Sequence, residues 1–175
     1  MKKNVVLIGF MGSGKSSIGH QLAHRLAYRF LDTDQMIEEK AGKSITGIMK
    51  EGGEEAFRRM EQELLETLND MPEKNVISTG GGLPIAQGNA DILRQTGFVI
   101  YLRTQPETVL KRLAGDTQRP LLAGPDKEKK VRELLEYREP IYEYACHMAV
   151  DTDKKGLMEL SEEIARNYSY FQKKK

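Results

Sequence analysis

The sequence predicts a three-layer α/β/α domain, in which helices cover both faces of a five-stranded parallel sheet. Short apolar runs alternate along the chain with longer segments of helical periodicity. The 175 residues, 39% of them hydrophobic, are enough to build one core without disulfides or metal. No internal repeat, low-complexity linker or change of composition marks a boundary. We therefore expect a single domain that spans residues 1–175.

The predicted strands are the short apolar runs. The first of them contains the sequence V-V-L-I at residues 5–8 and leads directly into a glycine. Together the predicted strands occupy residues 4–9, 29–32, 75–78, 98–102 and 148–151.

The segments between these runs carry the helical period. Ile18, Leu22 and Leu26 repeat every four residues and predict a helix after the first strand. A second, long helix is marked by Phe57, Leu64, Leu65 and Leu68, and a third by Val109 and Leu113. We expect two further helices at residues 127–144 and 157–170.

Residues 9–16 read G-F-M-G-S-G-K-S, the pattern of a phosphate-binding loop between a strand and a helix. The glycines at positions 9, 12 and 14 allow the backbone to place successive N–H groups around a phosphate, and the helix dipole favours the same anion. Lys15 is expected to reach the β- and γ-phosphates, and the Ser16 hydroxyl to bind Mg²⁺. The alternative is a Gly-rich turn without a ligand. The expected nucleotide contacts here are Gly12, Ser13, Gly14, Lys15, Ser16 and Ser17.

Two carboxylates follow the second predicted strand, where ligands of parallel sheets bind. Asp32 and Asp34 are two residues apart, so an extended backbone would direct both the same way. One could serve Mg²⁺ and the other an acceptor hydroxyl. The alternative is a turn or a helix N-cap that uses the aspartates for local hydrogen bonds.

Two further loops carry candidate residues. Gly80, Gly81 and Gly82 follow the third predicted strand, where their backbone can approach a ligand closely; a flexible loop without a role is the alternative. Arg119 begins a Pro- and Gly-containing segment between two helices that has the character of a mobile lid. Its cation could stabilise charge on a transferred phosphoryl group, whereas a solvated arginine in a plain connector is the alternative.

This ordered combination resembles the P-loop shikimate kinases of bacteria and plants, over nearly the whole chain. The resemblance implies a P-loop kinase fold with a mobile lid, and transfer of a phosphoryl group from ATP to the 3-hydroxyl of shikimate with Mg²⁺. The segments that carry it are residues 9–16, 32–34, 53–58 with Glu61, 80–82, 119–122, and Tyr137-Arg138 followed by Pro140 and Tyr142.

The resemblance also implies roles for the candidate residues. Arg58 and Arg138 would hold the substrate carboxylate, Asp34 its hydroxyls, and the backbone of residues 80–82 the same molecule. Lys15, Asp34 and Arg119 would be the catalytic residues, with Asp32 and Ser16 supporting Mg²⁺. The planar fork of arginine suits a carboxylate, and Glu61, one helical turn beyond Arg58, can orient it. A surface ion pair is the alternative for Arg58.

The adenine contacts implied by the resemblance are Arg112, on the helix after the fourth strand, and Lys155, in the loop after the fifth; Arg119 is expected to contact the nucleotide from the lid. The family has an arginine where this chain has Lys155. A lysine keeps the positive charge but offers no planar surface for stacking.

Composition limits the partners. The 27 basic and 26 acidic residues give a net charge of +1, which argues against nucleic acid and anionic membranes as partners. Cys146 is the single cysteine and cannot form an internal disulfide, which is typical of a reducing cytoplasm. No secretion signal or membrane-spanning stretch is evident. We expect a cytoplasmic enzyme, by default a monomer, that binds ATP and shikimate.

Three other functions remain open at this point. Gluconate kinases and nucleoside monophosphate kinases use the same scaffold, and substrate identity resides in the acceptor site. A nucleotide-sensing module could keep the phosphate loop without transferring phosphate. Retention of both aspartates and both candidate carboxylate-binding arginines argues against such a module.

Overall fold

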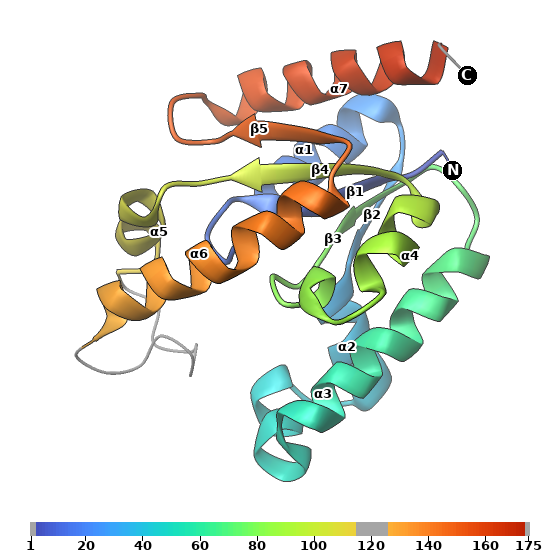
Figure 1. Ribbon diagram of the computed structural model, residues 1–175. Coiled ribbons are helices and arrows are strands. Elements are labelled where there is room, and N and C mark those ends of the chain that lie inside the picture. The colour runs from blue at the N-terminus through green and yellow to red at the C-terminus, as the bar shows by residue number, and fades with distance from the viewer. Residues whose placement is uncertain (1–2, 115–125, 174–175) are drawn as a thin grey trace.

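A computed structural model describes residues 3–114 and 126–173 of the chain (Figure 1). Its sheet has five parallel strands in the order β2-β3-β1-β4-β5. All five predicted strands are confirmed, to within one residue at each end. The strands are β1 (Val5–Ile8), β2 (Arg29–Asp32), β3 (Asn75–Ser78), β4 (Phe98–Arg103) and β5 (Met148–Asp151).

The described residues contain seven α-helices and a short 3₁₀ turn, Leu83–Ile85. Helix α4 was missing from the sequence prediction, and α2 was present only as the alternative in which the aspartates cap a helix. Both are short, and α4 buries its apolar residues at only two positions, Ala90 and Leu93, which is too few for a clear helical period. The helices are α1 (Lys15–Leu26), α2 (Thr33–Ala41), α3 (Ile45–Asp70), α4 (Asn89–Thr96), α5 (Pro106–Arg112), α6 (Lys127–Ala145) and α7 (Leu157–Lys173).

The helices form a layer on each face of the sheet, as the alternation of side chains along β1 requires. Val5 and Leu7 pack against α1 and α7, while Val6 and Ile8 face the core formed with α3, α4 and α6 (Figure 1). This is the predicted three-layer α/β/α arrangement. None of the described helices is both long and apolar enough to cross a membrane.

A kink in α3 shapes the region beyond the carboxyl ends of the strands. Gly53 has φ 72° and ψ 178°, a backbone conformation outside the helical region that L side chains rarely adopt. The helix therefore consists of two segments. Residues from both segments, Met49 before the kink and Arg58 after it, line the same cavity.

Candidate active site

The phosphate-binding loop has the backbone predicted from its glycines. Gly9, Gly12 and Gly14 have φ values of 144°, 77° and 92°. A Cβ at Gly9 would also lie 2.7 Å from the carbonyl oxygen of Leu102, so the loop depends on glycine for space as well as conformation. Helix α1, which was predicted after the first strand, begins at Lys15, and its N-terminus faces the loop.

Lys15 and Ser16 each have defined partners at this loop. The Lys15 ammonium donates to the carbonyl oxygens of Gly9 and Phe10, both at 2.9 Å. The Ser16 hydroxyl lies 3.1 Å from Oδ2 of Asp32 at the end of β2. A hydroxyl and a carboxylate oxygen are ligands that suit Mg²⁺, so this pair fits the metal that the sequence implies.

Asp32 and Asp34 line the same smaller cavity, but the expectation that an extended backbone would carry both was wrong. Strand β2 ends at Asp32, and Asp34 already belongs to α2. The other oxygen of Asp32, Oδ1, accepts from the backbone N–H of Asp34 and caps the helix. Asp32 therefore serves as the N-cap that the sequence left as an alternative, while its Oδ2 faces Ser16.

The three glycines after β3 lie against the candidate substrate-binding side chains. A Cβ on Gly80 would stand 2.5 Å from Oδ1 of Asp34, and one on Gly82 would stand 2.5 Å from Nη1 of Arg58. A Cβ on Gly81 would lie 3.8 Å from Nη1 of Arg138. The loop thus brings the three side chains to one place, and a side chain on Gly80 or Gly82 would displace its neighbour.

Two adjoining cavities lie beyond the carboxyl ends of the strands. The smaller, of about 240 Å³, is lined by the phosphate loop with Asp32, Ser78 and Thr79. The larger, of about 590 Å³, is lined by both segments of α3 and by Arg138. Both cavities share four lining residues, Met11, Asp34, Gly80 and Gly81. Asp34 therefore stands at the boundary between a phosphate site and a second ligand site.

Arg58 is held by two glutamates. Its Nη1 lies 2.6 Å from Glu61 Oε2, and its Nη2 lies 2.8 Å from Glu54 Oε1. The Glu61 side chain is only 2% exposed, so the predicted contact that orients Arg58 is present and buried. The Glu54 side chain is 63% exposed, and this half of the network is the surface ion pair left as an alternative.

Arg138 is a buried cation on the same cavity. The residue is 7% exposed, and its guanidinium carbon lies 5.5 Å from the ring centroid of Phe10. Its Nε has no hydrogen-bond partner, and no carboxylate in residues 3–114 or 126–173 forms an ion pair with it. The charge of Glu61 reaches Arg138 without a direct ion pair, and a buried cation with no directly paired carboxylate favours an anionic ligand. One turn along α6, the Tyr142 hydroxyl donates to the carbonyl oxygen of Gly81 at 2.6 Å and fixes the loop.

Glu61 has an altered acidity. Its burial raises its pKa above the ordinary 4.5, although the hydrogen bond and charge of Arg58 oppose this shift. The raised pKa means that the folded chain binds the Glu61 proton more tightly than the unfolded chain. The contribution of Glu61 to stability is therefore fully present below about pH 4.5 and is lost as the pH rises through its folded pKa.

We expect Glu61→Gln to reduce the pH dependence of stability. The amide does not ionise, so the variant should lose less free energy of unfolding than the wild type between about pH 4 and about pH 7. Urea unfolding of both proteins across this range measures the difference. Parallel pH profiles for the two proteins would contradict the assignment of a raised pKa.

The expected adenine contacts are only partly brought together. Arg112 donates to the carbonyl oxygen of Gly12 at 2.9 Å and to that of Thr152 at 3.4 Å, joining the phosphate loop to the segment after β5. Lys155 instead pairs with Glu163 of α7 at 2.5 Å and lines neither cavity. Arg119 and the predicted lid lie outside the described residues.

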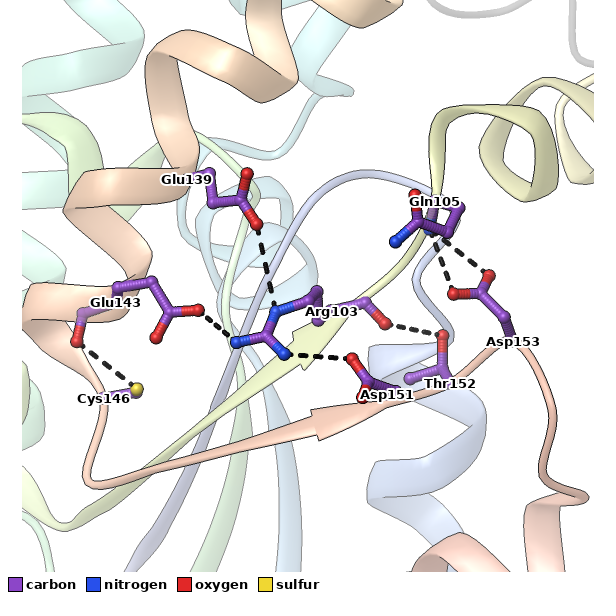
Figure 2. A network of polar contacts seen from close by, with 8 residues as sticks. All are labelled: Arg103, Gln105, Glu139, Glu143, Cys146, Asp151, Thr152 and Asp153. Carbon is purple, nitrogen blue, oxygen red and sulfur yellow. Dashed lines mark hydrogen bonds and ion pairs between the residues drawn. The ribbon is translucent and has the colours of Figure 1, made fainter.

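The sequence analysis missed Arg103, which joins β4 to α6 and β5. Figure 2 shows Arg103, at the end of β4, between Glu139 and Glu143 of α6 and Asp151 of β5. The hydrogen bond with Glu143 is the main cause of a raised Arg103 pKa. The network fastens α6, which carries Arg138, to the edge of the sheet. Its partners are 36 to 48 positions away from Arg103, and no local pattern signals them.

The chain has clear relatives. The family model for shikimate kinase matches residues 11–169. A shikimate kinase of Caldanaerobacter subterraneus subsp. tengcongensis is 41% identical over 95% of this chain and 96% of its own. The structure of a shikimate kinase from Acinetobacter baumannii in complex with shikimate aligns with a TM-score of 0.91 at 36% identity, covering 97% of this chain and 94% of that one. A gluconokinase from Sinorhizobium meliloti, at 18% identity and a TM-score of 0.60 over 98% of this chain and 97% of its own, shares the fold alone.

Proposed function

The chain belongs to the shikimate kinase family, and we propose that it transfers a phosphoryl group from ATP to the 3-hydroxyl of shikimate with Mg²⁺. The observation that carries this proposal is the pair of adjoining cavities that share Asp34. One cavity is built on a phosphate loop, and the other contains two arginines suited to a carboxylate. We further propose a cytoplasmic location, because the single cysteine suits a reducing compartment. The chain is taken as a monomer by default.

The nucleotide side supplies charge and positioning. Phosphoryl transfer proceeds through a loose transition state, so catalysis depends mostly on alignment and charge stabilisation. The loop N–H groups and Lys15 would hold the phosphates, and Ser16 with Asp32 would hold Mg²⁺. When bound, the metal offsets negative charge on the phosphates. Arg112 and Lys155 are assigned to the adenine side, and Arg119 to the charge that develops during transfer.

The acceptor side orients the attacking hydroxyl. Arg58 and Arg138 would bind the carboxylate of shikimate, and the backbone of residues 80–82 would support its ring. Asp34 would then accept a hydrogen bond from the reacting hydroxyl, since it borders both cavities. This arrangement aligns the acceptor oxygen with the phosphate site and keeps it away from the arginines.

An ADP-release assay with several acceptors tests the function. Shikimate should support ADP release, whereas gluconate and nucleoside monophosphates should not, and removal of Mg²⁺ with a chelator should stop the reaction. Phosphorus NMR of the product would locate the phosphate on the 3-hydroxyl. Preference for another acceptor would replace this function by that of a different small-molecule kinase, and no transfer to any acceptor would favour a nucleotide-sensing module.

The two arginines give a separate prediction. Arg58→Ala and Arg138→Ala should each raise the dissociation constant of shikimate about tenfold to a hundredfold, because a charge-assisted bidentate contact is lost. ATP affinity should change much less. Isothermal titration with each ligand measures both quantities.

Arg132→Ala is the matched control for this measurement. Arg132 lies on α6 like Arg138, but it pairs with Glu107 and Glu128 and lines neither of the two cavities at the strand ends. The control should bind shikimate like the wild type. If the arginine variants instead lost ATP affinity while shikimate affinity held, the two sites would have been interchanged.

A further inference from the structure

We propose that Glu54 competes with the substrate carboxylate for Arg58 and so sets the affinity of the acceptor site. The inference rests on the proposed function, because it takes a carboxylate acceptor as the ligand of Arg58. In this arrangement Glu54 is paired with the guanidinium of Arg58 until the substrate carboxylate displaces Glu54. Glu54 is thus an affinity-determining residue that acts through Arg58 and lines the larger cavity with it.

The contacts of Arg58 leave little room for a second carboxylate. Glu54 Oε1 accepts from Nη2 at 2.8 Å and from Nε at 3.3 Å, so one oxygen uses the paired donors on one edge of the guanidinium. Glu61 takes Nη1 at 2.6 Å. A Cβ on Gly82 would lie 2.5 Å from Nη1 and 2.8 Å from Nη2, so the loop backbone covers this part of the group. A bidentate ligand on Arg58 must therefore displace Glu54.

The two glutamates differ in how readily they can leave. Glu61 is 2% exposed, and moving it would require the buried core of the site to rearrange. Glu54 is 63% exposed, and its carboxylate can return to water. An exposed ion pair of this kind is worth little, so an incoming carboxylate that also reaches Arg138 can displace it. The contrast assigns Glu61 to orienting Arg58 and Glu54 to occupying it.

Competition lowers the apparent affinity for substrate. A ligand that needs the Nε–Nη2 edge binds only the fraction of molecules in which Glu54 has left it, and its apparent dissociation constant rises by the inverse of that fraction. The typical worth of an exposed pair corresponds to a factor of about threefold to fivefold. Loss of the Glu54 charge should therefore tighten shikimate binding, which is the opposite of what loss of a supporting residue would do.

Titration of shikimate into Glu54→Gln, Glu54→Ala and the wild type tests the proposal. Both variants should bind shikimate about threefold to fivefold more tightly, and their KM for shikimate should fall by a similar factor. The KM for ATP should stay at the wild-type value. Glu63→Gln is the matched control, because Glu63 lies on the same segment of α3, is 60% exposed and forms a 2.8 Å pair with Lys40 that lies outside the cavity.

Each outcome is decisive. Weaker shikimate binding in both variants would make Glu54 a supporting partner of Arg58, and unchanged affinity would show that the ion pair does not compete; either result overturns the inference. Equal tightening in Glu63→Gln would reduce the effect to general surface charge and overturn it as well. A wild-type protein that neither binds nor phosphorylates shikimate would instead remove the proposed function itself, so the two failures are distinguishable.

Discussion

Lys15→Ala should lower turnover by about a hundredfold to a thousandfold, the usual effect of removing one charge-stabilising donor from a transition state. The Lys15 ammonium lies within the phosphate loop, where it donates to the carbonyl oxygens of Gly9 and Phe10. Under the proposed function it would offset the charge that develops on the transferring phosphoryl group. The loss should therefore be larger in kcat than in the KM for shikimate. Initial rates at saturating shikimate and varied ATP measure it.

The fold must survive this substitution for the result to be informative. Thermal unfolding should show a native transition, because the glycine backbone of the loop and the helix that follows it do not depend on the lysine side chain. Lys40→Ala provides the control: Lys40 is 60% exposed, pairs with Glu63 and lines neither of the cavities beside the sheet. Turnover of Lys15→Ala within tenfold of the control would contradict the role assigned to Lys15.

The elements that could be predicted from sequence are those with local causes. The phosphate loop is contiguous, so its glycines, its helix start and its strand appear in one stretch of sequence. The strands are likewise marked by short apolar runs, whose side chains pack into the core on each face of the sheet. The pair Arg58 and Glu61 was found for the same reason, since residues three apart meet on one helix face.

The parts that could not be predicted depend on distant residues or on competing local preferences. Tyr142 donates to the carbonyl of Gly81 across 61 positions, and Arg103 binds Asp151 across 48, so tertiary packing alone brings them together. The backbone conformation at Asp34 was mispredicted because Asp32 can either continue a strand or cap a helix, and the structure has the cap. Lys155 was assigned by resemblance, whereas in the structure its charge is paired with Glu163.

The two aspartates should therefore respond differently to the same substitution. Asp34→Asn should lower turnover by about a hundredfold or more and weaken shikimate binding, since the amide no longer accepts the hydroxyl proton as a carboxylate can. Asp32→Asn should instead raise the Mg²⁺ concentration needed for half-maximal rate by about tenfold or more, because the charge proposed to hold the metal is lost. Rates measured over a matrix of Mg²⁺ and shikimate concentrations separate the two effects.

Neither substitution should disturb the local structure, so the two variants can be compared directly. Asparagine is as good an N-cap as aspartate, so Asp32→Asn can keep the Oδ1 contact with the backbone N–H of Asp34 and preserve α2. At position 34 the amide is nearly isosteric beside Gly80, so packing at that close contact is kept as well. An exchange of phenotypes, with Mg²⁺ dependence shifted only in Asp34→Asn and shikimate binding only in Asp32→Asn, would require the roles to be exchanged. If both variants had wild-type kinetics, phosphoryl transfer would not take place at the boundary between the two cavities, because Asp34 is the carboxylate that both of them share.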